Sequence, residues 1–554
     1  MDEKELLEEI KTEFEYLKTE RAKYESDWKD TENYVRASLY DWTGTTKKPP
    51  RPDRYTSRPA HNLTTLVSGL LGYTISPNIT WLKLSLEQMD WLKYAGVKDW
   101  LEQAEKAFYA AVNRSNLYSE APIFLKDAAT FGHTAMLIDE DLNEGRIRYS
   151  TRPTPEVYLD VNEYDEVDTV YRSFSMTIRN MVSFFGEDAC HHEVKQKNKE
   201  KGSRNNTVNI LHAVYPRKDA DPEAMDIKRA PWASLYIDLD NDHLIEESGY
   251  WENPFACFAW ERIPGSAYGD SPSMQALPDI LLLNKAEEAR IRLAQLSAEP
   301  PMNVPNKMRG SENVVPGGFN YFDRPDEILT PINTGANFPI TINVTQDIES
   351  RIRDWFHVDF FLMLQAREGQ KTATEVIELQ GEKAATLSSI IVNMNNFLAS
   401  LVRRTFNILY RQGKIPKPPQ VLAGTGAQIK IDFVGPLAQA QKKYHQAGGI
   451  TQSMALVAPV LQLFPETKDY IDGDRLAVGI LDANGFPQSA LREDDEVKGI
   501  RDARAQIAEK QEQKAIAMQQ QGAVMQNMDK LNQPIKQGTV LAEVGKQLAG
   551  GMQR

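Results

Sequence analysis

The feature that most constrains the fold is a long amphipathic pattern between Thr372 and Arg411. Thr372-Ala-Thr-Glu375 fits a capping box, in which a hydroxyl and a carboxylate each satisfy a backbone N–H at a helix start. Gly413 and Pro416 then supply a stop. A helix of this length spans roughly 60 Å at ~1.5 Å per residue, so it must be shared between several layers or several subunits. Its apolar positions are Val376, Leu379, Leu387, Ile390, Met394, Phe397, Leu401 and Ile408.

Two further helices are predicted before this one. The first covers 278–298, begins with Pro278 at a position that needs no N–H donor, and ends at Glu299-Pro300-Pro301. The second covers 346–364, with Thr345 as a plausible cap. Residues 300–344 between them lack helical spacing and suit short strands and turns. The apolar seam of the first helix consists of Leu282, Ala286, Ala289, Leu293 and Leu296.

The N-terminal segment carries an amphipathic stripe that predicts a helix within residues 1–40. A surface helix packed on the body explains this short stripe better than a free coiled coil. Residues 41–59 are Pro-rich and basic, which suits an arm to a neighbouring subunit, a solvated linker or a contact with nucleic acid. The stripe contains Leu6, Ile10, Phe14, Leu17, Tyr24 and Trp28, and the basic residues are Lys47, Lys48, Arg51, Arg54 and Arg58.

Strands dominate the middle of the chain. Two helices at 97–115 and 117–130 precede them, and another helix is predicted at 176–185. Residues 195–206 are highly charged and predict a mobile loop. The fold class is therefore α+β, mainly helical. Strands are predicted at 136–138, 146–150, 156–160, 169–174, 208–215, 233–239, 244–247 and 428–434, and C-terminal helices at 437–447, 450–463, 474–480 and 493–520.

Composition narrows the classes of function. The chain has 554 residues and a net charge of −14, which disfavours general adhesion to nucleic acid because such binding needs many cations on phosphates. An excess of acidic residues suits a protein past which DNA slides better than one that binds DNA tightly. A need for solubility alone also explains the negative charge. No apolar run approaches the ~20 residues of a membrane helix. Cys190 and Cys257 are the two cysteines, and free thiols in a cytosol-like compartment are expected.

The sequence contains none of the common motifs for catalysis considered below. There is no Gly-x-x-x-x-Gly-Lys-Ser/Thr loop and no Gly-x-Ser-x-Gly elbow. Two acidic turns, at 139–143 and 238–242, lack the glycine and glutamate that an EF-hand requires, so hairpin turns are predicted there. Cys190-His191-His192 has no second ligand pair at zinc-site spacing. We therefore expect no enzyme activity, no metal and no cofactor.

Four motifs together resemble the portal, or head-to-tail connector, proteins of short-tailed double-stranded DNA phages. The resemblance covers about residues 62 to 500. The motifs are Tyr268-Gly-Asp-Ser-Pro272, the helix leading to Ala298-Glu-Pro-Pro301, the stretch around Gly317-Gly318, and Lys371-Thr-Ala-Thr-Glu375 after a polar loop.

The resemblance implies a portal fold with an α/β wing, a two-helix stem, a small β-containing clip, a long spine helix and a helical crown. The implied parts are an N-terminal helix and basic arm at 1–61, the wing at 62–267, the first stem helix at 268–299, the clip at 300–344, the second stem helix at 345–364, the channel loop at 365–373, the long helix at 374–412, the crown at 413–500, and a helical barrel or disordered Gln-rich tail at 501–554.

The same resemblance implies a ring, usually a dodecamer, at one capsid vertex of the virion, assembled in the host cytoplasm. An ATP-driven terminase threads the genome through it, and the tail attaches later. The implied partners are copies of the chain, the major capsid protein, scaffolding protein, the terminase large subunit, tail adaptor proteins, and double-stranded DNA bound without sequence specificity. No membrane is involved.

Candidate site residues follow from these parts. The polar loop between the second and third helices offers weak phosphate contacts on a flexible element, which suits transient contact with a moving duplex. A plain interhelical turn is the alternative. The loop residues are Gln365, Arg367, Glu368, Gln370 and Lys371; the stem residues that could face the channel are Lys285, Arg290 and Arg292; the clip residues for terminase or tail are Asn303, Lys307, Arg309, Phe319 and Tyr321.

Two other functions fit parts of the sequence. A scaffold or adaptor could oligomerise through long helices without a DNA channel, but the strand-rich clip and the wing argue against it. An unrecognised nucleic-acid enzyme is the other alternative, and a metal-dependent nuclease assay tests it.

Replacing Arg367 and Lys371 by alanine tests the loop. We expect the ring to assemble and DNA packaging or retention to fall, because weak phosphate contacts are lost. The yield of packaged DNA measures this, and a normal yield would contradict the assignment.

Overall fold

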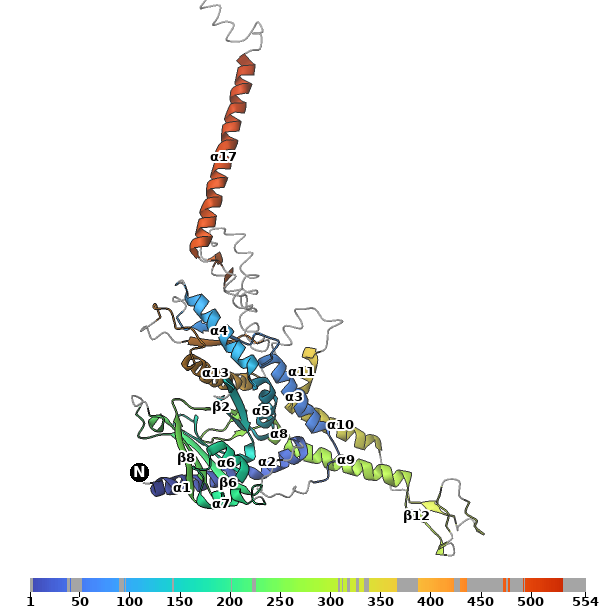
Figure 1. The fold of residues 1–554 in the computed structure, drawn as a ribbon. Coiled ribbons are helices and arrows are strands. Elements are labelled where there is room, and N and C mark those ends of the chain that lie inside the picture. Colours follow the sequence, from blue (N-terminus) through green and yellow to red (C-terminus); the bar gives the residue numbers. More distant parts are fainter. Residues whose placement is uncertain are drawn as a thin grey trace, which may run out of the picture. The chain divides into compact units, whose positions relative to one another are not determined.

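The structure is a computed structural model that divides into two compact units, residues 1–485 and 486–554, each described by itself. It describes residues 3–36, 40, 52–88, 94, 96–141, 144–200, 202–221, 226–306, 309–310, 312–315, 319–324, 328–332, 338–365, 387–422, 429–435, 472–474, 477–478, 492 and 494–531 (Figure 1).

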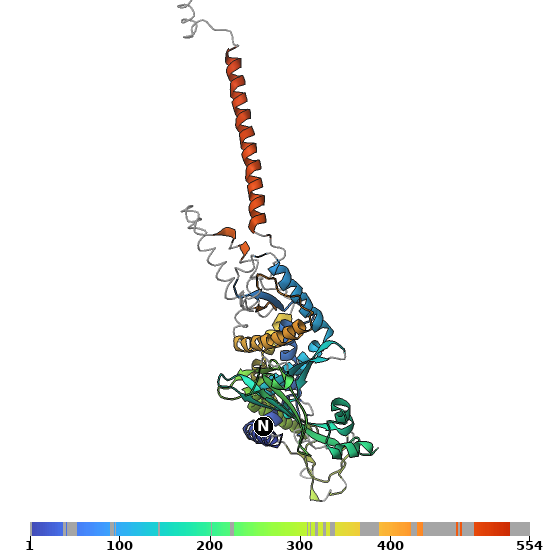
Figure 2. The same cartoon turned by 60° about the vertical axis from the view of Figure 1, so that its left-hand side comes forward.

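A five-stranded antiparallel sheet, in which each strand pairs with the next, forms one layer of the first unit. Side chains alternate between its faces. Leu211 and Ala213 of β6 pack against α1 (Glu3–Ala22), whereas Val208 and Ile210 pack with α6 (Ile178–Phe185) and the following helix. The sheet therefore has helices on both faces (Figure 2). Its strands are β4 (Val157–Val161), β5 (Val167–Thr177), β6 (Thr207–Pro216), β7 (Trp232–Asp238) and β8 (His243–Tyr250).

The N-terminal helix packs on the body, as the sequence predicted. Ile10, Phe14 and Leu17 are buried against the sheet. The predicted stripe is nevertheless broken, because α1 ends at Ala22, α2 covers Glu25–Thr31, and a π-helix covers Glu32–Arg36. Trp28 consequently lies in a different apolar cluster from the α1 residues.

A buried ion pair joins the π-helix to α5 (Leu117–Phe131). The Arg36 guanidinium lies 2.7 Å from Asp127, and the Tyr40 hydroxyl donates to the same carboxylate at 2.9 Å. Burial raises the pKa of Asp127 to about 6, although Arg36 opposes the shift. The N-terminal segment is thereby fixed to the helical layer.

The helical layer packs around a second sheet, with strand order β3-β2-β9, and includes the helices on both sides of it. Phe124 of α5 stacks on Phe397 of α13 at 4.2 Å between ring centroids. The strands are β2 (His133–Asp141), β3 (Arg146–Arg152) and β9 (Phe255–Ala259), and the helices are α3 (Arg58–Thr74), α4 (Val97–Arg114), α5 and α13 (Ser388–Arg411).

The long-helix prediction is confirmed where the structure describes it. Along α13, Ile390, Met394, Phe397, Leu401 and Ile408 are all buried, and Gly413 has the positive φ of 68° expected at a helix end. Residues 366–386 lie outside the described residues, so the full length of roughly 60 Å stays a prediction.

Strand β14 (Ile429–Phe433) pairs with β1 (Leu82–Leu86), which lies far earlier in the chain. The strand was predicted, but its partner was not, because pairing between such distant segments leaves no local pattern. The predicted helices at 437–447 and 450–463 lie outside the described residues, as does most of 474–480.

Three predictions are wrong in detail. The predicted second helix begins earlier, at Phe338, and is broken into α10 (Phe338–Trp355) and α11 (Val358–Gln365), with His357 at a positive φ of 49°. Thr345 is therefore a buried residue inside α10 and not a cap. Residues 195–206 are not wholly a loop, since α7 (His192–Lys199) covers their first part and buries Val194.

In the second unit, α17 (Asp494–Leu531) confirms and extends the helix predicted at 493–520. Throughout the described ranges, every helix is either too short or too polar to pass through a lipid bilayer.

The substitution Gly69→Ala tests the contact between α3 and α11. A Cβ at Gly69 would lie 2.1 Å from the ring of Phe361, which is fully buried. We expect the free energy of unfolding to fall by about 1–3 kcal/mol, as in overpacked cores, and urea denaturation measures it. Gly72→Ala on the same helix is the matched control, since nothing lies within 4 Å of its Cβ. Equal stability of the two variants would contradict this packing.

Candidate functional site

A pair of helices, α9 (Leu277–Ala298) and α10, leaves the helical layer side by side and carries a small sheet at its far end (Figure 1). The first half of α9 is anchored in the core through Ile280 and Leu283, and α10 is anchored through Ile348 and Ile352. The Arg351 guanidinium of α10 lies 3.2 Å from the Asp279 carboxylate of α9.

The segment that leads into α3 contacts the pair of helices α9 and α10. Asn284 of α9 is 8% exposed, accepts a hydrogen bond from Tyr55 N at 2.8 Å, and donates one to Asp53 O at 3.1 Å. Arg58 then lies 3.4 Å from Glu349 of α10. The end of the N-terminal arm therefore contacts α9, and the first residue of α3 contacts α10.

The second half of α9 is different from the first. Between Ala289 and Glu299 only Leu293 is partly buried, and the other side chains are exposed. The apolar seam predicted from the sequence lies on the face away from the buried residues. We call this seam the α9 stripe; it consists of Leu282, Ala286, Ala289, Leu293 and Leu296, of which Leu282 is 49% and Leu296 38% exposed.

The far end of the pair contains a two-stranded sheet, β12 (Met302–Asn303) with β13 (Thr330–Pro331). Most of the large apolar residues described around it are exposed. Phe319 and Tyr321 are 79% and 86% exposed. A monomer rarely leaves so many large apolar side chains in water at one tip, so this tip has the character of a docking surface.

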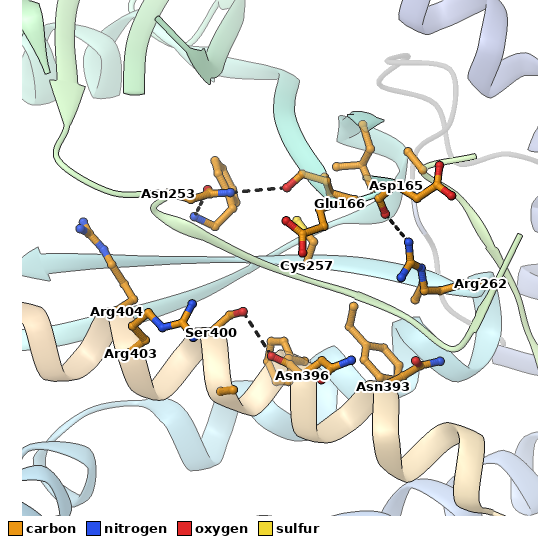
Figure 3. Close-up of a pocket in the computed structure, with 18 of the residues that line it drawn as sticks. Asp165, Glu166, Asn253, Cys257, Arg262, Asn393, Asn396, Ser400, Arg403 and Arg404 are labelled. Carbon is orange, nitrogen blue, oxygen red and sulfur yellow. Dashed lines mark hydrogen bonds between the residues drawn. The ribbon is translucent and has the colours of Figure 1, made fainter. Parts of the chain in front are cut away.

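A cavity of about 580 Å³ lies between α13, β9 and the turn from β4 to β5 (Figure 3). Its lining is mixed: Phe397 and Phe258 lie beside Asn396 and Arg403. Cys257 also lines it, and burial raises the pKa of that thiol to about 12, so the thiol stays protonated.

Glu252 forms the polar centre at one side of this cavity. The Arg404 guanidinium, which is 6% exposed, donates to the Glu252 carboxylate at 2.7 Å, and Arg411 donates at 3.0 Å. Asn407 donates to the other carboxylate oxygen. Three residues of α13 thus bind one carboxylate of the loop that precedes β9.

One of the two acidic turns considered as a metal site is organised by its own aspartate. The Asp238 carboxylate accepts from Asp240 N and Asn241 N at 3.0 and 3.1 Å, and so organises the predicted hairpin turn between β7 and β8. Both Cys190 and Cys257 are free thiols. Among the described residues no three His, Cys, Asp or Glu side chains gather at metal-binding distance.

Comparison with known proteins decides the family. The family model for the bacteriophage head to tail connecting protein matches residues 7–491. The chain belongs to this family of phage portal proteins. The portal protein of Salmonella phage epsilon15 is 30% identical over 528 residues, which cover 92% of each chain. The probable portal protein of Bordetella phage BPP-1 is 27% identical over 514 residues, covering 91% of this chain and 92% of that one.

These matches confirm the predicted family. Phage portal proteins are components of the virion. The mixture of helices and strands is compatible with the predicted α+β class. The individual site residues stay predictions. Arg367, Glu368, Gln370 and Lys371 lie outside the described residues, and only the backbone of Gln365, at the end of α11, is described.

The stem cations differ from one another. Arg290 lies 2.6 Å from Glu287, and Arg292 lies 2.6 Å from Glu288. Both charges are therefore compensated within α9, which weakens their candidacy as phosphate contacts. Lys285 is exposed, and the described residues include no carboxylate that pairs with it.

The clip candidates are mostly accessible. Asn303 is an exposed residue of β12, and Arg309 is exposed, as are Phe319 and Tyr321. Lys307 lies outside the described residues. The sequence pattern gave no sign of the Glu252 network or of Asn284, because each joins residues more than a hundred positions apart.

The variant Glu252→Ala tests the polar centre of this portal protein. It leaves the buried Arg404 guanidinium without its carboxylate, and we expect the free energy of unfolding to fall by roughly 3 kcal/mol. Urea denaturation measures the change. Glu144→Ala is the control, because the Arg146–Glu144 pair, 2.8 Å apart, is exposed and contributes less than about 1 kcal/mol. Equally small losses in both variants would contradict the importance of Glu252.

Proposed function

We propose that this portal protein forms a closed ring at one vertex of the capsid. The genome enters through the ring during packaging and leaves through it during ejection. The same ring is the platform for the terminase and later for the tail. Membership of the head-to-tail connecting family supports this proposal, because a protein of that kind joins a head to a tail.

The observation that carries the ring proposal is the exposed α9 stripe. Transfer of apolar side chains out of water is favourable. Within one chain Leu282, Ala289 and Leu296 stay exposed, whereas Ala286 and Leu293 are partly buried. A second copy of the chain is the simplest cover. Repetition of one such heterologous contact around an axis closes a ring.

The parts of the ring follow from this arrangement. We assign α9 and α10 to the stem around the channel, and the small sheet between them to the clip. We assign the sheet-rich region before α9 to the wing. Helix α13 belongs to the long helix that supports the channel loop at 365–373. The C-terminal unit belongs to the crown or barrel. A dodecamer is the proposed ring size.

Docking partners are proposed from exposure and charge. The clip tip, with Phe319 and Tyr321, is the surface for terminase during packaging and for tail adaptors afterwards. DNA in transit requires few strong phosphate contacts, and the net charge of −14 suits this need. We also propose that the ring assembles in the host cytoplasm with the major capsid and scaffolding proteins.

A structural adaptor without a channel is the second candidate, and one experiment separates the two. A phage lacking this gene, complemented or not by the gene in trans, is grown and its heads are assayed for nuclease-protected DNA. The portal proposal predicts heads without protected DNA unless the gene is supplied. DNA-filled heads that lack only tails would contradict it and favour the adaptor.

A further inference from the structure

A layer of polar side chains lies between the five-stranded sheet and the second sheet. On the face of β6 that carries Ile210 and Val214, the residue between them is His212, which is only 1% exposed. Val214 packs in the same cluster as Phe255 of β9, and the centroids of the His212 and Phe255 rings are 6.4 Å apart. The imidazole is therefore enclosed between the two sheets.

The contacts of His212 suit a neutral imidazole. Its ring stacks on the ring of Tyr236 on β7, with 4.1 Å between the centroids and 2° between the planes. Its Nε2 lies 3.0 Å from the hydroxyl of Ser234, a group that can either donate or accept a hydrogen bond. Among the residues that the structure describes, no carboxylate pairs with this ring. A proton on His212 would thus lack a counter-charge.

Two arginines beside His212 oppose a further positive charge. Arg172 of β5 lies directly opposite His212 in the strand register, and Glu156 compensates it at 2.7 Å. Arg152 of β3 has a buried Nε, and the described part of the chain gives its guanidinium neither an ion pair nor a hydrogen bond. Burial, together with repulsion from Arg152 and Arg172, holds the pKa of His212 well below its ordinary value.

The other titratable groups around this layer do not supply a new negative charge in acid. Burial raises the pKa of Tyr236 and of Cys257 to about 12 and also raises the pKa of Tyr250, so these three groups stay neutral. The Tyr250 hydroxyl lies 3.5 Å from the Asp139 carboxylate. Burial raises the pKa of Asp139, so this carboxylate loses its charge earlier than an ordinary aspartate as the pH falls.

We propose that this layer is an acid-sensitive joint, in which protonation of His212 places a third positive charge beside Arg152 and Arg172 and separates the two sheets. In the unfolded chain His212 takes up its proton near pH 6.5, whereas the folded chain excludes that proton. A histidine with a lowered pKa stabilises the fold above about pH 6.5, and this stability is lost as the pH falls below that value. The joint is thus closed at neutral pH and opens in acid.

The variant His212→Gln tests the joint, because glutamine can bond to Ser234 but takes up no proton. Urea unfolding of the full-length chain is measured at one protein concentration and at pH values between about 5.5 and 7.5. Uptake of one proton on unfolding changes the unfolding equilibrium constant by up to about tenfold per pH unit. Below about pH 6.5 we therefore expect this constant to rise more steeply in the wild type than in the variant, by a factor that approaches ten per pH unit.

Hydrogen exchange locates the effect within the molecule. After correction for the intrinsic effect of pH, the amides of β6 and β9 should exchange several-fold faster at about pH 5.5 than at about pH 7.5 in the wild type. In His212→Gln this acceleration should be absent.

A second variant and a control make the result specific. His212→Phe keeps a ring that can stack on Tyr236, and it decides the question if His212→Gln does not fold. His192→Gln on α7 changes an exposed histidine and should follow the wild type. The buried His133 and His357 are present in every variant, so their contributions cancel.

Two outcomes would overturn the inference. One is the same pH dependence of unfolding in the wild type and in the His212 variants. The other is an acid-induced rise in hydrogen exchange that spares β6 and β9.

Discussion

The uneven burial of α9 is the constraint on which the rest of the structure depends. Its first half is held in the core by Ile280, Leu283 and Asn284, whereas its second half leaves the body with the α9 stripe in water. A long helix with an uncovered apolar face is stable only when something covers it. If copies associate as proposed, cover for this stripe would come from a neighbouring copy.

Three polar side chains anchor segments of the body to one another. Asn284 binds the N-terminal arm to α9, Glu252 binds three residues of α13, and Asp127 binds the π-helix. Each anchor joins segments that are distant in sequence, and removal of one partner would leave a buried donor or charge unsatisfied. Each of these contacts therefore ties segments of the body together that are distant in the sequence.

Much of the local structure was predictable, because it depends on periodicity and turn residues. The α9 helix, the buried seam of α13, the strands of the wing and the stop at Gly413 all follow local patterns that the structure confirms. The break at His357 was missed because the spacing of Ile348, Ile352 and Leu362 continues across it. Pairing of β1 with β14 and the contacts of Glu252 could not be predicted, since they arise from tertiary packing between distant segments.

The site residues stay predictions. Charge alone grouped Lys285, Arg290 and Arg292, and the structure shows that Arg290 and Arg292 each pair with a glutamate one turn earlier on the same helix. The sequence showed the apolar seam of α9 but not whether this seam faces the core or the solvent. Helical periodicity alone does not say which face of a helix packs against the rest of the chain. In the structure this seam is largely exposed, and its role as an interface is part of the proposal.

The central claim is that copies of this chain close into a ring. The most direct measurement is the mass of the purified protein under native conditions, together with negative-stain images of the same sample. The account predicts a closed ring of about a dozen subunits with a central hole. A persistent monomer, at concentrations well above those in an infected cell and in the presence of scaffolding protein, would contradict it.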